Sequence, residues 1–188
     1  MESDLIDRAR RGDSEAWETV VRQHQTPAFR LAYLLLGDAD DAEDVAQEAF
    51  LRAFQKLDRF DTRRAFRPWL LSIVANLARN HRRSAGRYLA ALRRFYHSEP
   101  EQDRTPGVEQ GQLQQWEAQV LWQAIRRLRH DDQQIVYLRY FLELPVEEVA
   151  EALNIAPGTV KSRLHRALER LRAVIAAEFP LLAEERIP

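Results

Sequence analysis

The chain contains no cysteine and only six glycines, and it has no long run of apolar residues. Without cysteine there is neither a disulfide nor a thiolate metal site, and nothing points to an oxidising compartment. The first residues lack the apolar run of a signal peptide, and no stretch approaches the length that spans a bilayer. We therefore expect a soluble cytoplasmic protein with no membrane segment.

Signatures of catalysis and of cofactor binding are missing as well. The five histidines have no carboxylate three or four residues before them and no mutual metal-ligand spacing. There is no glycine-rich phosphate loop and no G-x-S-x-G nucleophile motif. A helical metalloenzyme built on the acids of residues 38–48 is therefore excluded, and we expect no catalytic residue, no metal, no cofactor and no enzymatic activity.

Charge is segregated along the chain, although the formal net charge is only −1. Residues 38–48 hold six acids and no cation, whereas residues 59–94 hold ten arginines against Asp61 alone. Two segments of opposite charge suit two partners of opposite character.

Apolar residues recur at helical spacing through most of the chain, which predicts an all-α protein. Helices are expected over residues 4–10, 14–23, 26–36, 42–57, 68–83, 116–128 and 133–142. Gly12-Asp13, Thr26-Pro27 and Gly37 separate the first of these helices. In the helix at residues 42–57, the expected buried stripe is Ala46, Ala49, Phe50, Ala53, Phe54 and Leu57.

Helical periodicity fades over residues 84–112, although a short helix could lie at residues 88–96. Residues 98–112 are rich in proline, glycine and acids, with Glu99, Glu101, Asp103 and Glu109 against Arg104. Such a composition predicts a flexible linker. The chain therefore divides into two small helical domains, residues 16–83 and 113–175, that the linker at residues 84–112 joins.

Two short helices and a tight turn are predicted within residues 145–172. The first helix has apolar residues at i, i+3, i+4 and i+7, with glutamates on its other face. Asn154 suits a left-handed helix end, Pro157 suits a first helical position, and Thr159 is a candidate N-cap. From Pro157 to Arg172 there are five cations against Glu169 alone.

This pattern is typical of a helix-turn-helix, which places its basic second helix in the major groove of DNA. There, arginine or lysine can read guanine while the other cations neutralise phosphates. An ordinary helical hairpin with a solvated charged face is the alternative. The acidic first helix, the turn residues and the basic second helix together favour DNA binding.

Three segments resemble the successive signatures of bacterial extracytoplasmic-function sigma factors. They are DAEDVAQEAFLRAFQKLDRF at residues 41–60, AFRPWLLSIVANLARNHRR at residues 65–83 and LPVEEVAEALNIAPGTVKSRLHRALERLR at residues 144–172. The resemblance implies a minimal two-domain sigma factor, with no further domain before Ala16 or after Arg172. Such a protein makes core RNA polymerase promoter-specific and is commonly masked by an anti-sigma factor.

The resemblance also implies a role for individual residues. The helix that binds core polymerase would expose Asp44, Gln47, Glu48, Leu51, Arg52 and Gln55. The melted −10 strand would meet Arg63, Arg64, Phe66, Asn76, Arg79, Asn80 and Arg83. The duplex −35 element would meet Thr159, Lys161, Ser162, Arg163, His165 and Arg166.

Some of these positions have a plainer interpretation. Phe66 and its neighbour Trp69 could simply pack in the core, and His165 could be exposed without touching DNA. For the protein as a whole, the alternative is a conventional helix-turn-helix regulator that does not replace a sigma subunit. That alternative explains residues 145–172 but leaves the arginine-rich residues 61–83 and the match at residues 44–57 without a role.

Overall fold

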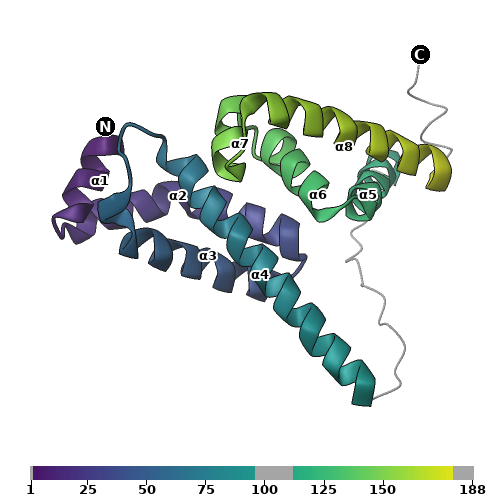
Figure 1. Cartoon of the computed structure of the whole chain (residues 1–188), viewed down its shortest axis with the longest axis horizontal. Coiled ribbons are helices and arrows are strands. Elements are labelled where there is room, and N and C mark those ends of the chain that lie inside the picture. Colours follow the sequence, from purple (N-terminus) through teal and green to yellow (C-terminus); the bar gives the residue numbers. More distant parts are fainter. Residues whose placement is uncertain (1, 96–111, 180–188) are drawn as a thin grey trace.

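The computed structural model describes residues 2–95 and 112–179, and the side chains of residues 2–84 and 119–179. Every regular element in this part of the chain is helical and none of it is a strand, which confirms the all-α prediction (Figure 1). The predicted linker at residues 84–112 falls mostly outside the described residues.

The first four α-helices form one packed unit. They are α1 (Glu2–Arg10), α2 (Ser14–Leu36), α3 (Ala39–Gln55) and α4 (Phe66–Phe95), with the 3₁₀ turn η1 (Leu57–Arg59) after α3. Helices α2, α3 and α4 pack against one another, and α1 packs on α2 (Figure 1). Their shared core includes Ile6, Val20, Leu31, Leu70 and Val74, all essentially inaccessible to solvent.

Helix α2 is continuous, so the predicted break at Thr26-Pro27 is wrong. Pro27 lies inside the helix, where a proline commonly costs about 3 kcal/mol. Buried residues continue on one face past it, from His24 to Ala28 and Leu31, and the packing of this face outweighs the local cost. Gly37 ends the helix as predicted, with φ +81° and its N–H bonded to the Tyr33 carbonyl at 2.8 Å.

The bounds of α3 and α4 also differ from the prediction. Helix α3 begins at Ala39 because the Asp38 carboxylate accepts a hydrogen bond from the Asp41 N–H at 2.9 Å and caps the helix. Helix α4 begins at Phe66, and Pro68 lies in its first turn, where a missing N–H costs little. The same helix continues to Phe95, so residues 84–95 extend α4 instead of leaving it.

Phe66 lies in the core of this unit and is fully buried. Its ring centroid is 5.2 Å from that of His24, 5.4 Å from that of Trp69 and 5.6 Å from that of Phe60. Contact between Phe66 and a DNA base would require the ring to leave this cluster. The structure therefore favours the plainer interpretation, that Phe66 packs in the core, over the expectation that it shapes a base pocket.

His24 makes the stability of this unit depend on pH. Burial lowers the pKa of the imidazole, although Nε2 lies 2.8 Å from the Glu2 carboxylate. A histidine whose pKa is lower in the folded state contributes stability above its unfolded pKa, and this contribution is lost as the pH falls. We expect the free energy of unfolding to fall between pH 7 and pH 5, and His24→Leu to reduce that slope in urea titrations. An unchanged slope in His24→Leu would rule out His24 as its source.

The remaining helices form a second unit. They are α5 (Gln112–Arg127), α6 (His130–Val136), the π-helical turn η2 (Tyr137–Phe141), α7 (Val146–Leu153) and α8 (Pro157–Glu178). The long helix α8 lies along α5, α6 and α7 (Figure 1). The helix predicted at residues 133–142 is thus divided into α6 and η2. Gln133 joins α5 to α6, because its side-chain amide donates to the Leu128 carbonyl at 3.0 Å.

Candidate nucleic-acid interface

Helices α7 and α8 form the predicted helix-turn-helix. Asn154 ends α7 in the left-handed conformation, at φ +53°, and the Ile155 N–H bonds to the Ala150 carbonyl at 3.0 Å. Helix α8 begins at Pro157, as expected. Thr159 is not its N-cap, however, because Thr159 lies inside the first turn and its N–H donates to the Ala156 carbonyl at 2.9 Å.

The residues predicted to read the −35 element lie on the outward face of α8. Lys161, Ser162, His165 and Arg166 are exposed, and Thr159 and Arg163 are half-buried. On the opposite face, Val160, Ala167 and Leu171 are buried against the rest of the domain. A helix held by one face and exposed at its N-terminal half is the arrangement that a helix-turn-helix presents to the major groove.

Two of these side chains are held by their own helix. The Arg166 Nε donates to the Ser162 carbonyl at 3.2 Å, and the His165 Nε2 lies 3.3 Å from the Glu169 carboxylate. Both contacts are exposed, so DNA could replace them at little cost.

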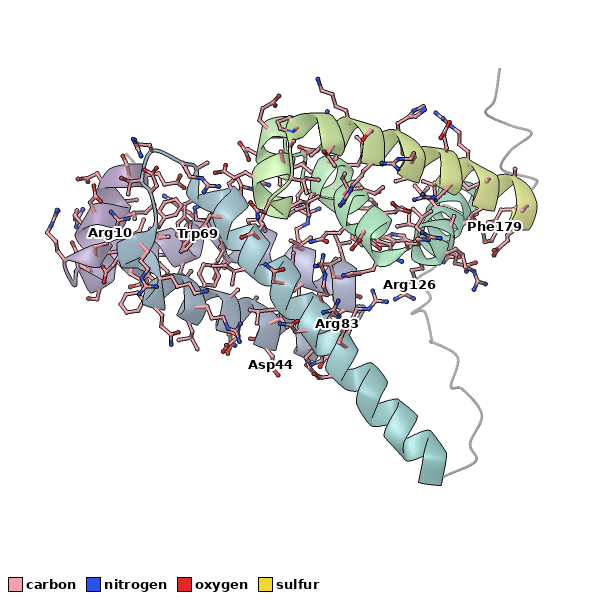
Figure 2. All side chains as sticks on the ribbon, viewed as in Figure 1. Arg10, Asp44, Trp69, Arg83, Arg126 and Phe179 are labelled. Carbon is pink, nitrogen blue, oxygen red and sulfur yellow. The ribbon has the colours of Figure 1, made fainter. Side chains whose placement is uncertain are left out.

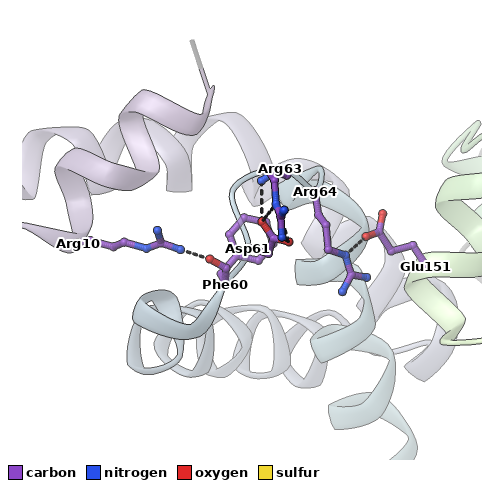
Figure 3. A network of polar contacts seen from close by, with 6 residues as sticks. All are labelled: Arg10, Phe60, Asp61, Arg63, Arg64 and Glu151. Carbon is purple, nitrogen blue, oxygen red and sulfur yellow. Dashed lines mark hydrogen bonds and ion pairs between the residues drawn. The ribbon is translucent and has the colours of Figure 1, made fainter.

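In the first domain, the loop before α4 presents a fixed guanidinium. Arg63 is 88% exposed, and it donates to the Asp61 carboxylate from Nε at 2.9 Å and from Nη2 at 2.8 Å (Figure 3). These bonds, with one from the Arg63 backbone N–H, lower the pKa of Asp61 to about 2. Asp61 therefore stays ionised and holds Arg63 outward at neutral pH.

Helix α4 carries four of the predicted −10 residues along one side, and Arg64 lies in the loop before it. Asn76, Asn80 and Arg83 are exposed at i, i+4 and i+7, and Arg79 is half-buried beside them. Figure 2 labels Arg83 on this helix. This row of amides and guanidiniums can offer hydrogen bonds to base edges and charge to phosphates.

A polar pocket of about 430 Å³ opens beside this row. Its wall in the first domain is Arg64, Trp69, Ser72, Ala75, Asn76 and Arg79. Trp69 is only partly buried, so its ring serves both the core and the pocket. The sequence favoured core packing for Trp69 over a contact with DNA and did not indicate Ser72, although the spacing 69, 72 and 76 places them on one helix face. An aromatic ring beside amides and arginines can stack a base.

The residues predicted to bind core polymerase lie on the outer face of α3. Asp44, Gln47, Leu51, Arg52 and Gln55 are exposed, and Glu48 is half-buried. Leu51 is 60% exposed, an unusual position for leucine within a helix that is otherwise packed. Arg52 and Glu48 form an ion pair at 2.7 Å beside it.

Phe54 was expected in the buried stripe of α3, but it is 49% exposed. One side of its ring contacts Trp17, at 5.1 Å between centroids, and the rest faces solvent. The expectation was wrong because Trp17 of α2 covers only one side of the Phe54 ring. Phe54 and Leu51 together give the outer face of α3 an apolar centre, which a protein interface requires.

Over the described ranges 2–95 and 112–179, no three histidine or acidic side chains come close enough to hold a metal ion. Nor is any helix of these ranges both long and apolar enough to cross a membrane.

Family models match both domains. The model for sigma-70 region 2 matches residues 20–88, and the model for sigma-70 region 4 matches residues 118–171. Among curated proteins, the chain is 32% identical to the ECF RNA polymerase sigma factor SigW of Bacillus subtilis, over 89% of this chain and 92% of that one. It is 33% identical to the RNA polymerase sigma-H factor of Pseudomonas aeruginosa, over 96% and 95% of the two chains.

Two solved structures share the fold. CnrH in complex with the cytosolic domain of CnrY covers 94% of this chain and 97% of that chain, with a TM-score of 0.68 and 23% identity. The sigma factor RpoE of Bartonella quintana, in complex with the anti-sigma factor NepR, covers 85% and 96%, with a TM-score of 0.67 and 24% identity.

Proposed function

The chain belongs to the ECF RNA polymerase sigma factors, non-enzymatic subunits that direct promoter-specific transcription, and we propose how its domains divide that work. Residues 16–83 bind core polymerase and read and open the −10 element. Residues 113–175 read the −35 element, and residues 84–112 link the two. Family membership disfavours the alternative of a conventional regulator. A transcription subunit of this kind works in the cytoplasm.

The main support for this division is that each domain exposes its own surface suited to binding DNA. The outward face of α8 presents cations and hydroxyls from a rigid helix, which suits the edges of base pairs in a duplex. The face of α4 presents amides, arginines and a partly exposed tryptophan beside a pocket, which suits unstacked bases. One face positions the promoter and the other holds its opened strand.

The proposed contacts with the −10 strand are made by Arg63, Arg64, Asn76, Arg79, Asn80 and Arg83. Phe66 has a different role, because it lies in the core beneath Trp69 and fixes the ring that faces the pocket. The arginines neutralise phosphates, so strand binding weakens as salt rises.

The proposed contacts with the −35 duplex are made by Thr159, Lys161, Ser162, Arg163, His165 and Arg166. Arg163 and Arg166 read guanine, and Lys161 meets a phosphate. On the polymerase side, Asp44, Gln47, Glu48, Leu51, Arg52 and Gln55 form one helical face with Leu51 at its centre. These assignments give each exposed face of the two domains a separate partner.

An anti-sigma factor is a further partner. The solved structure of the Bartonella quintana sigma factor holds its anti-sigma factor NepR, and its fold matches this chain over most of both lengths. In this chain such a partner could bind the outer face of α3, with its apolar centre, and the exposed basic residues of α4.

Arg163→Ala and Arg166→Ala test the division of work. Each bidentate contact with guanine is worth roughly 1–3 kcal/mol, so each variant should bind a duplex −35 probe about 5- to 150-fold more weakly. Binding of a single-stranded −10 probe and of core polymerase should stay unchanged. Fluorescence anisotropy with the two probes measures the first pair of values, and gel filtration with core polymerase measures the third.

Arg172→Ala is the matched control, because it removes an exposed arginine from the same helix beyond the predicted contacts. It should lower the affinity for the duplex only slightly, because one positive charge that attracts DNA phosphates is removed. Loss of core association in Arg163→Ala or Arg166→Ala would contradict the proposed separation of the two domains.

A further inference from the structure

Arg10, the last residue of α1, joins this helix to the segment before the loop that carries Arg63. Its Nε donates to the Leu57 carbonyl at 2.8 Å, and its Nη2 donates to the Phe60 carbonyl (Figure 3). Its Nη1 donates to the Asp7 carboxylate at 3.0 Å, one turn back on the same helix. Each nitrogen of the guanidinium thus bonds to a protein oxygen, so Arg10 is placed to hold the chain and not to meet DNA.

Helix α1 is a fixed base for these bonds. Ile6 and Ala9 are buried in the core of the first unit. The Arg8 guanidinium donates to the Asp13 carboxylate at 2.8 Å, and the same carboxylate caps α2 by accepting from the Ala16 N–H at 3.0 Å. Because both its apolar face and its polar end are held, α1 can fix the segment that Arg10 reaches.

The Phe60 carbonyl lies where the chain leaves the core and enters the loop. The Phe60 ring is buried, with its centroid 4.6 Å from that of Trp69, so packing holds the side chain. The direction of the carbonyl depends instead on the ψ angle of Phe60, which packing of the ring does not fix. Since the peptide unit is planar, a hydrogen bond to this carbonyl also fixes the N–H and the Cα of Asp61.

Asp61 transmits this constraint to Arg63. The Asp61 carboxylate accepts from the Arg63 backbone N–H at 3.1 Å and from its guanidinium at 2.8 Å. The Arg63 side chain is 88% exposed, so its direction depends on Asp61 and not on packing. Figure 3 shows the resulting series of contacts, from Arg10 to Phe60 and from Asp61 to Arg63.

We propose that Arg10 is a positioning residue for the −10 strand: it holds the Phe60–Asp61 peptide from α1 and thereby directs Arg63 toward a phosphate of the strand. Arg10 lies outside residues 20–88, which the model for sigma-70 region 2 matches. The first helix therefore takes part in strand binding without touching DNA. This inference rests on the −10 surface proposed above, and it adds a residue that acts through Arg63.

Arg10→Met is the direct test, because methionine keeps an apolar stem but has no donor. A single-stranded −10 probe should bind about two- to fivefold more weakly, the effect of losing one exposed charge contact. The slope of log Kd against log salt concentration should become shallower by up to about 0.7, the value for one phosphate contact with a single strand. Fluorescence anisotropy at several salt concentrations measures both quantities.

NMR of the Arg63 side chain reports its positioning without DNA. In the wild type the Arg63 Nε–H is bonded to the Asp61 carboxylate at 2.9 Å, which should slow its exchange with water. Arg10→Met should speed that exchange, and Arg63→Lys identifies the resonance by removing it. A role of Arg10 in stability alone would lower the urea midpoint but leave this exchange and the salt slope unchanged.

Arg11→Met is the matched control, because it removes the same charge from the adjacent, exposed position. It should change neither the salt slope nor the exchange of the Arg63 Nε–H. Arg10→Lys keeps the charge and a donor, so it should restore part of the strand affinity, and it remains informative if Arg10→Met does not fold. Binding of the −35 duplex should stay the same in all three variants.

A double-mutant cycle separates action through Arg63 from an independent effect. In the Arg63→Ala background, Arg10→Met should change the affinity for the strand by less than about twofold, because coupled residues are not additive. An effect of Arg10→Met that is equally large in both backgrounds would overturn the proposal. So would strand binding and Arg63 exchange that Arg10→Met leaves unchanged.

The outcome for Arg63→Ala and Arg79→Ala distinguishes this proposal from the proposed function. If both variants bind the strand more weakly and Arg10→Met does not, the role of Arg10 is rejected and the −10 surface stands. If all three variants bind the strand as the wild type does, the −10 surface itself is rejected, and the role of Arg10 with it.

Discussion

Leu51→Asp is expected to weaken association with core RNA polymerase strongly while the protein stays folded. Leu51 is 60% exposed, so a polar replacement costs the free protein little. In the proposed complex the same side chain is the apolar centre of the interface, and loss of such a hot-spot residue costs about 2 kcal/mol or more. The expected change is a dissociation constant at least about 30-fold higher, measured by surface plasmon resonance on immobilised core polymerase.

Gln23→Asp is the matched control for this variant. It adds the same charge at an exposed helical position on α2, away from the outer face of α3. Gln23→Asp should bind core polymerase as the wild type does, and both variants should unfold at similar urea concentrations. Unimpaired binding by Leu51→Asp would show that the outer face of α3 is not the polymerase contact.

Phe66→Ala is expected to destabilise the first domain by about 3–5 kcal/mol. The ring is fully buried among Trp17, His24, Phe60 and Trp69, and its removal leaves a cavity that this cluster cannot close. Urea denaturation followed by tryptophan fluorescence would measure the loss.

Phe66→Leu separates core packing from a direct DNA contact. Leucine fills much of the cavity, so most of the stability should return, and strand binding should return with it. A Phe66→Ala protein as stable as the wild type, but defective in binding the −10 strand, would show that Phe66 contacts DNA directly.

Local sequence patterns predicted most of the helices because their causes are local. Gly37 and Asn154 end helices in the left-handed conformation that their types favour, and Pro157 begins α8. The failures have tertiary causes. Pro27 is tolerated because the buried face of α2 continues past it, and Phe54 is exposed because Trp17 of α2 contacts only one side of its ring.

The predicted site residues lie on the faces that the sequence indicated, with Phe66 as the exception. Helical spacing alone places Asn76, Asn80 and Arg83 on one side of α4. Spacing cannot show that Glu151, on the polar face of α7, accepts a hydrogen bond from Arg64, 87 residues away. Contacts of that kind depend on how two domains pack, and no local pattern encodes them.

Transcription with purified components tests the central claim most directly. A promoter would be selected from a random DNA library by core polymerase together with this protein, and transcripts would then be mapped with and without the protein. We expect initiation at a fixed start downstream of paired −35 and −10 sequences, dependent on the protein and lost in Leu51→Asp. Binding to a duplex operator with neither core association nor initiation would contradict the account and identify a conventional regulator.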